Sequence, residues 1–128
     1  MLDTSAILDA AEQRTMYGAA LIDTAASVGI TLLLPATALL EAWQQCTPAS
    51  RPLLDLLTEM PTGVLAPLDQ ADTAAAAGVL AADAGQPNAR PGTVHAVHLA
   101  RTRDWPVVTA DVDVVLALDP HVPFESLP

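Results

Sequence analysis

The sequence contains no lysine, a single cysteine and few aromatic side chains, and each shortage excludes a class of protein. Five arginines stand against fifteen acidic residues, so the formal net charge is −10. This balance argues against a protein that coats nucleic acid through phosphate contacts. The aromatic residues are too few for a base-stacking platform; they are Tyr17, Trp43, Trp105 and Phe124. The lone Cys46 excludes an internal disulfide and indicates a small buried thiol.

Long apolar runs are also missing, although hydrophobic residues make up 52% of the chain and the mean hydropathy is +0.37. The longest candidate, residues 30–34, has the length of a strand, far below the roughly 18 residues of a membrane span. The opening Met1, Leu2 and Asp3 lack the basic and apolar regions of a secretory signal. We therefore expect a cytoplasmic protein without membrane association, folded as one domain over residues 1–128.

Proline and glycine divide the chain into short apolar runs and longer helical patterns, which is typical of βαβ units and a parallel sheet. The predicted strands cover residues 2–4, 30–34, 63–68, 106–109 and 122–124. The predicted helices cover residues 5–12, 15–28, 36–46, 51–59, 70–84, 93–103 and 111–118, with Thr4 or Ser5 as the first N-cap. We expect strands 2–4, 30–34 and 106–109 to be neighbours in a central parallel sheet, because their apolar continuity requires helices on both faces.

Three acidic residues lie where such a sheet would bring them together. Asp3 follows the first strand, Asp111 follows the strand at 106–109, and Glu41 lies about a turn and a half into the helix after the second strand. In α/β sheets, ligands bind outside the carboxyl ends of the strands. Converging carboxylates repel one another unless a cation compensates, and Mg²⁺ and Mn²⁺ prefer oxygen ligands. The pattern predicts a metal site where a coordinated water attacks a phosphodiester.

Each acid also has a purely structural explanation. Asp3 can cap the helix that follows it, and Asp111 and Asp113 lie at a helix start, where acids complement the helix dipole. Glu41 belongs to a residue type that is usually exposed. The conjunction of these residues, rather than any one of them, carries the prediction. Among the arginines, Arg14 and Arg51 are the candidates for approaching a substrate groove.

Three segments resemble the motifs of the PIN domain family, the metal-dependent RNA-cutting fold typified by VapC-type toxins. LDTSAIL at residues 2–8 is similar to the opening motif, PATALLEAW at 35–43 to the motif with the glutamate, and WPVVTADVDVVLAL at 105–118 to the last motif. The closing PHVPFESLP resembles the ends of actinobacterial members. The resemblance implies a PIN-like central parallel sheet flanked by helices on both faces and Mg²⁺- or Mn²⁺-dependent hydrolysis of RNA. It also implies a homodimer and inhibition by a partner antitoxin.

Carried over by position, Asp3, Glu41 and Asp111 become catalytic metal ligands. Asp113 becomes a further ligand, and Thr4 or Ser5 a polar support beside them. Family members usually have one more aspartate, about sixteen residues before the threonine of the V-x-T-x-D segment. That position is Thr93 in this chain.

Thr93 places a neutral hydroxyl where the family resemblance implies a charged ligand. A PIN-fold binding module without turnover therefore stays open beside the endoribonuclease, and Asp83 is a weaker candidate for supplying the missing carboxylate. A different phosphatase or nucleotide hydrolase is a third reading, since a fold does not fix a function. The homodimer is expected to use one of the apolar helices between residues 15 and 59, which carry Met16, Tyr17, Leu53, Leu54, Leu56 and Leu57.

Overall fold

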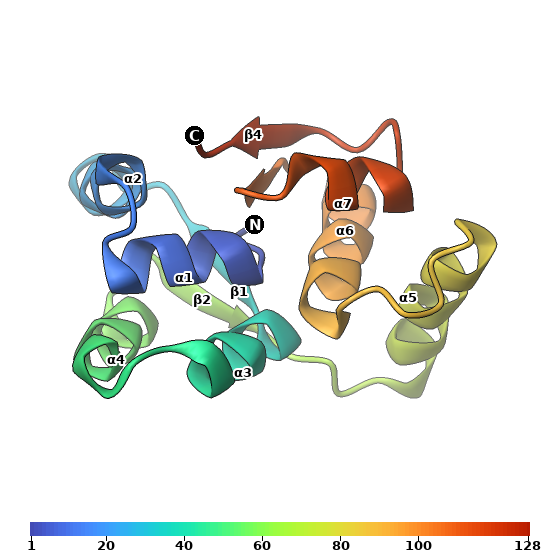
Figure 1. Ribbon diagram of the computed structural model, residues 1–128, viewed down its shortest axis with the longest axis horizontal. Helices are drawn as coiled ribbons and strands as arrows, with labels where there is room; N and C mark the ends of the chain where they lie inside the picture. The colour runs from blue at the N-terminus through green and yellow to red at the C-terminus, as the bar shows by residue number, and fades with distance from the viewer.

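Seven α-helices and four short strands make up the protein in the computed structural model, which describes residues 1–128 (Figure 1). The strands are β1 (Leu32–Pro35), β2 (Gly63–Ala66), β3 (Val107–Thr109) and β4 (Phe124–Ser126). The helices are α1 (Thr4–Glu12), α2 (Met16–Val28), α3 (Ala36–Gln45), α4 (Arg51–Glu59), α5 (Ala71–Asp83), α6 (Pro91–Arg103) and α7 (Val112–Leu118), with a short 3₁₀ turn, η1 (Pro48–Ser50), before α4. The mixed α/β class expected from the sequence is confirmed. None of the helices has both the length and the apolar character that crossing a membrane requires.

The strands form two small parallel sheets, β1 with β2 and β3 with β4, rather than the single central sheet that we expected. Residues 1–3 hydrogen-bond to one strand of each sheet. The amide of Leu2 donates to the carbonyl of Leu33 at 3.0 Å, and the amide of Asp3 donates to Val108 at 3.2 Å. Val108 in turn donates to the carbonyl of Met1 at 2.7 Å. The predicted first strand is therefore reduced to a parallel bridge between Leu2 and Val108.

The side chains of β1 and β3 alternate between two buried apolar clusters. Leu33 and Val107 pack with residues of α5, α6 and α7. Leu34 and Val108 pack with residues of α1, α3 and α4. Because successive side chains of a strand point to opposite faces, both faces of these strands are buried. This arrangement explains why the strands read as continuous apolar runs without polar alternation.

The start of α1 differs from its predicted N-cap by one residue. Asp3 has extended backbone angles, and its side-chain oxygen accepts a hydrogen bond from the amide of Ala6 at 2.9 Å. Asp3 is therefore the N-cap, and the prediction of Thr4 or Ser5 is wrong. The structural explanation of Asp3 as a helix cap is therefore confirmed. It also shortens the predicted strand, because Thr4 already belongs to the helix.

The remaining boundaries follow the local sequence signals with small shifts. Helix α2 ends at Gly29, whose φ of 76° suits glycine, as predicted. Helix α6 begins at Pro91, two residues earlier than expected, because proline is favoured in the first turn of a helix. Strand β1 excludes Ile30, which is 53% exposed, and extends to Pro35. Strand β4 begins at Phe124, where the predicted strand ended.

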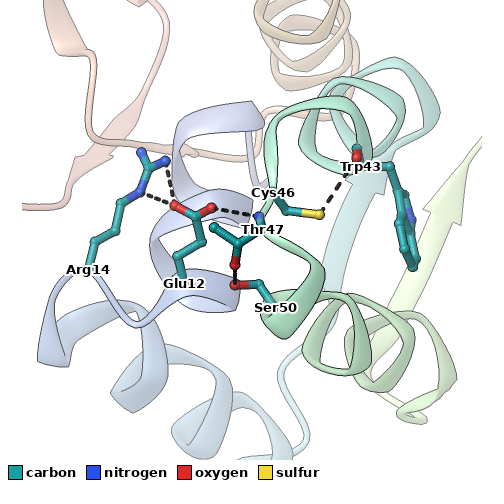
Figure 2. Close-up of polar contacts among 6 residues, drawn as sticks. All are labelled: Glu12, Arg14, Trp43, Cys46, Thr47 and Ser50. Atoms are coloured by element: carbon teal, nitrogen blue, oxygen red, sulfur yellow. Dashed lines mark hydrogen bonds and ion pairs between the residues drawn. The ribbon is translucent and has the colours of Figure 1, made fainter.

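Cys46 is buried, as the sequence predicted, at the end of α3. Its thiol donates a weak hydrogen bond to the carbonyl of Trp43 (Figure 2). Beside it, the hydroxyls of Thr47 and Ser50 lie 2.8 Å apart across η1. Both contacts lie in the turn between α3 and α4.

The apolar helices hold less surplus surface than the sequence indicated. Leu54 and Leu57 are buried in the core of the protein itself. Met16, Tyr17 and Leu56 are 78%, 55% and 57% exposed. Half of the six residues expected at an interface are therefore available on the surface, and they lie on α2 and α4.

Candidate functional site

Four helices begin in the same region of the molecule. Figure 1 shows the starts of α1, α3, α6 and α7 turned toward the middle of the view. Helix α3 packs against both α1 and α6, and α6 packs against α7. The first turn of a helix carries unpaired N–H groups and a partial positive charge. This region is therefore a favourable environment for carboxylates, and Asp3, Glu41 and Asp111 all lie on its elements.

Asp3 is the buried member of this group, with 1% of its surface exposed. Its Oδ1 accepts hydrogen bonds from Ser5 Oγ at 2.7 Å and from the amide of Ala6, and its Oδ2 accepts from Thr109 Oγ1 at 2.7 Å. Burial raises the pKa of Asp3 above its usual 3.8, these hydrogen bonds oppose the rise, and the nearby charge of Asp111 adds to it. Asp3 is thus a carboxyl group whose ionised form is costly in the folded protein.

Thr109 connects Asp3 to the loop that carries Asp111. Its side chain is fully buried, and its hydroxyl accepts a hydrogen bond from the amide of Asp111 at 2.9 Å while donating to Asp3. The hydroxyl of Ser5 accepts from the amide of Ala110 at 2.8 Å and lies 3.2 Å from the Thr109 hydroxyl. The end of β3 is therefore tied to the first turn of α1. In the sequence, Thr109 stands out only as the threonine of the V-x-T-x-D segment, and its bridging position has no local signal.

Asp111 and Asp113 are both exposed at the start of α7. Asp111 occupies the N-cap position, but its side chain makes no capping hydrogen bond. Both residues therefore lie at a helix start, as expected, where their charges complement the helix dipole, but Asp111 does not cap the helix through its side chain. Its carboxylate is left accessible beside the buried Asp3.

Glu41 is held from two sides at the start of α6. Its Oε2 accepts a hydrogen bond from Thr4 Oγ1 at 2.8 Å, and its Oε1 accepts from the amide of Gly92 at 3.1 Å. A β-carbon at Gly92 would overlap Thr4 Oγ1 and would lie 2.7 Å from Ala38 Cα. Only glycine lets the start of α6 come this close to α3. In the sequence, the Pro-Gly pair at a helix start was the available sign of such a close approach. The next residue is Thr93, which is 5% exposed.

The structure therefore brings the predicted residues into one region through two hydrogen-bond networks. One network joins Asp3, Ser5, Thr109 and Asp111, and the other joins Thr4, Glu41 and Gly92. Thr4 and Ser5, predicted as polar supports, are the adjacent residues that connect the two. No three His, Cys, Asp or Glu side chains form a group that could hold a metal ion.

The donor chemistry of these residues fits a hard divalent cation. A carboxylate offers about four lone-pair positions for hydrogen bonds or metal ligation. Asp3 uses three of them and Glu41 uses two, while Asp111 is exposed. The unused positions are all on oxygen atoms, which Mg²⁺ and Mn²⁺ prefer. The ligand type therefore fits the expected metal, whereas the three carboxylates do not converge on one point.

Asp83, the weaker candidate for a further carboxylate, lies away from Glu41 and the start of α6. It lies at the end of α5 and lines a cavity with His98 and Arg101, in the second half of α6. Gly92, the residue of α6 that contacts Glu41, is at least six residues earlier. At about 1.5 Å of rise per residue, that separation is about 9 Å along the helix axis.

The arginines are only partly available to a substrate. Arg14, expected near a substrate groove, forms an ion pair with Glu12 at 2.6 Å, and Glu12 also accepts from the amide of Thr47 (Figure 2). Arg101 pairs with Asp119 at 3.3 Å. Arg90, which sequence analysis did not select, is exposed and immediately precedes α6. It is the arginine that lies closest in sequence to Gly92.

Comparison of the chain with protein-family models, with curated proteins and with solved structures gives no match. The function must therefore be argued from the chemistry of this site.

Proposed function

We propose that the protein is a metal-dependent endoribonuclease with a PIN-like fold, resembling the toxin of a toxin–antitoxin pair. The observation that carries the proposal is the pairing of a buried Asp3 with an exposed, non-capping Asp111 through Thr109. An acid that only terminates a helix would use its carboxylate as a cap. Asp3 caps α1, whereas Asp111, at the N-cap position of α7, makes no capping hydrogen bond and keeps an accessible carboxylate.

In this proposal, hydroxyl and amide groups orient the acidic side chains, and the acidic side chains bind the metal. The hydroxyls of Ser5 and Thr109 hold Asp3 in one orientation, and Thr4 and the Gly92 amide hold Glu41. Such fixed donors reduce the reorganisation needed when a substrate binds. Asp111 and Asp113 would face the solvent from which RNA arrives. Asp3, Glu41, Asp111 and Asp113 are thus the proposed ligands.

A bound Mg²⁺ or Mn²⁺ would supply charge stabilisation for the phosphodiester and a water of lowered pKa. A cation is also needed for electrostatic reasons, because a chain with a net charge of −10 repels RNA. An acidic cluster becomes attractive to phosphate only when a cation dominates its local charge. Arg90 could then add a phosphate contact beside the start of α6.

A second candidate function is a PIN-fold binding module that does not cleave RNA. The observation that favours it is Thr93, a buried neutral residue next to Gly92 at the helix start where the resemblance implies a further aspartate. Without that carboxylate, fewer negative charges compensate a divalent cation, and the affinity of the site for the metal falls.

The proposed partners follow from the same resemblance. They are an RNA substrate, a cognate antitoxin and a second copy of the chain, in a cytoplasmic setting. For the homodimer, the exposed Met16, Tyr17 and Leu56 are the supporting residues. Leu56 also lines an apolar cavity of about 410 Å³ between α1, α2 and α4, and exposed apolar surface of this kind often marks an interface.

The decisive experiment combines calorimetric titration of Mn²⁺ with a labelled-RNA cleavage assay. The variants are Asp3→Asn and Asp111→Asn, and the matched control is Asp55→Asn, because Asp55 is an exposed aspartate of α4 outside the site. We expect metal-dependent cleavage by the natural protein and by the control, and its loss in the two site variants. RNA binding without cleavage in the natural protein would favour the binding module. Equal cleavage by all four proteins would refute the site.

A further inference from the structure

A second cavity, of about 210 Å³, lies beside the candidate site between α3, α5 and α6. Two of its lining residues connect it to Glu41. Thr37 lines the cavity and precedes Glu41 by one helical turn, so that both side chains project from the same face of α3 toward α6. Pro91 also lines the cavity, and the next residue, Gly92, donates its amide to Glu41.

One of the residues that line the cavity is buried and has an unmet hydrogen bond. This residue, His95, is 1% exposed, and its Nε2 atom has no hydrogen-bond partner within the protein. Its other ring nitrogen, Nδ1, lies 3.0 Å from Thr37 Oγ1, which is also 3.3 Å from the carbonyl of Pro91. Whichever tautomer the ring adopts, Nε2 retains either a donor or an acceptor to satisfy. An unpaired buried polar atom costs free energy, so a ligand that pairs with it gains affinity.

The other lining residues define the charge and shape of what fits. Apart from His95, none of the ten lining residues has an ionisable side chain. Burial and the neighbouring His98 lower the pKa of His95, so the ring is neutral at pH 7. The wall formed by α5 consists of the small residues Ala77, Gly78 and Ala81. An uncharged, flat and partly apolar group therefore fits, whereas a phosphate finds no cation in the cavity.

The size excludes most ordinary small-molecule ligands. Pockets for drug-sized ligands occupy about 300–1,000 Å³, so the cavity has room for about one heterocycle. A nucleobase matches each requirement: it is flat, it is uncharged at neutral pH, and its edge offers both N–H donors and nitrogen or carbonyl acceptors. Single-stranded RNA is commonly recognised through splayed bases that hydrogen-bond along these edges.

We infer that this cavity receives one nucleobase of the RNA, with His95 pairing to the edge of the base. The inference rests on the proposed function for the choice of RNA, and it adds a specificity pocket to it. The sugar and phosphates stay outside the cavity, where Arg90 adjoins Pro91. The backbone of the same RNA then leads from the cavity past Gly92 toward Glu41. The cavity would in this way recognise the identity of a base that lies close to the hydrolysed phosphodiester.

The test uses free nucleosides, which have a base but no phosphodiester, so that binding is measured independently of cleavage. Each of the four ribonucleosides is titrated into the natural protein, and the imidazole NMR signals of His95 report occupancy. The blocking variant is Gly78→Leu. A β-carbon at Gly78 meets no atom within 4 Å, and replacing glycine inside a helix favours the helix, so the variant should fold. The matched control is Ala75→Leu, which adds a leucine to an exposed position of α5 outside the cavity.

We expect at least one nucleoside to shift the His95 signals in the natural protein and in Ala75→Leu. Gly78→Leu should weaken that binding about tenfold or more. His95→Phe keeps a planar ring without the nitrogen atoms and should weaken it as well; because this variant lacks the reporting imidazole, its nucleoside binding is measured by calorimetric titration beside that of the natural protein. The inference is overturned if no nucleoside perturbs His95, as expected of a cavity that holds only water, or if Gly78→Leu binds as tightly as the control.

These outcomes separate the base pocket from the proposed hydrolysis. Nucleoside binding that Gly78→Leu blocks, in a protein that cleaves no RNA, would support the pocket and reject the hydrolysis. Metal-dependent cleavage by a protein that binds no nucleoside at His95 would support the hydrolysis and reject the pocket. If the pocket is correct, Gly78→Leu should also change which RNA sequences are cleaved while Ala75→Leu leaves them unchanged.

Discussion

Replacing Asp3 with asparagine and with alanine separates its structural contribution from its charge. The carboxylate accepts three hydrogen bonds, from Ser5, Ala6 and Thr109. An asparagine oxygen can keep the two bonds at the Oδ1 position, and its amide nitrogen can donate to the Thr109 hydroxyl. Alanine keeps none of them. The pair of variants therefore differs chiefly in hydrogen bonding, while both remove the charge.

The expected magnitudes follow from these contacts. Loss of an N-cap costs about 1 kcal/mol. Each hydrogen bond from Ser5 and Thr109 to a charged acceptor contributes about 1.5–3 kcal/mol. Relief from burying an ionised carboxylate offsets part of that loss. We therefore expect Asp3→Ala to lower the free energy of unfolding by about 3 kcal/mol. At about pH 4, Asp3→Asn should change it by less than about 1 kcal/mol.

The pH dependence has a definite sign. The folded-state pKa of Asp3 is raised above its usual 3.8, chiefly by burial. A raised pKa means that the folded state binds the proton more tightly than the unfolded state does. The contribution of Asp3 to stability is then fully present below its unfolded-state pKa and is lost as the pH rises through the folded-state pKa. Asp3→Asn lacks this loss, so its stability relative to the natural protein should increase with pH across that window.

The assay is urea denaturation of the natural protein and both variants at about pH 4 and about pH 7, read as free energies of unfolding. Asp111→Asn is a further comparison, because the charge of Asp111 contributes to the raised pKa. It should reduce the slope without removing it. Equal pH slopes for the natural protein and Asp3→Asn would show that Asp3 is not the titrating buried carboxyl. If a cation binds the site, Mn²⁺ should stabilise the natural protein more than Asp3→Asn.

Three other substitutions test the remaining features. Thr93→Asp should tighten Mn²⁺ binding and raise cleavage while lowering stability without metal, because Thr93 is buried; unchanged calorimetry and RNA assays would mean that position 93 is not the missing ligand position. Gly92→Ala should lower stability by about 1–3 kcal/mol, because its β-carbon would lie 2.7 Å from Ala38 Cα; thermal unfolding at the natural midpoint would contradict the close approach. The natural protein should scatter light as a dimer at high micromolar concentration, and Leu56→Glu should scatter as a monomer because Leu56 lies on the proposed interface; a monomeric natural protein would remove the homodimer proposal.

Local chemistry was enough to place most elements of the fold. The helix predicted at residues 51–59 is observed with the same bounds, and the helix predicted at 15–28 ends at Gly29 as expected. Prolines, glycines and apolar periodicity act within a few residues of where they stand, so their effects can be predicted from sequence alone. The chain around Asp3 is the exception. There a helix cap and a strand end compete for the same residue, and long-range hydrogen bonds to Leu33 and Val108 decide the outcome.

Residue order along the chain was enough to predict which residue types could make the site: acids after apolar strands and hydroxyls beside them. How these residues are used depends on contacts between segments that are far apart in the chain. Thr109 and Asp3 are 106 positions apart, and Gly92 and Glu41 are 51 apart. Whether an aspartate caps a helix, as Asp3 does, or leaves its carboxylate exposed, as Asp111 does, depends on which donors other segments bring to it. Pairings of this kind have no local signal, because their free energy arises only when packing removes water from both partners.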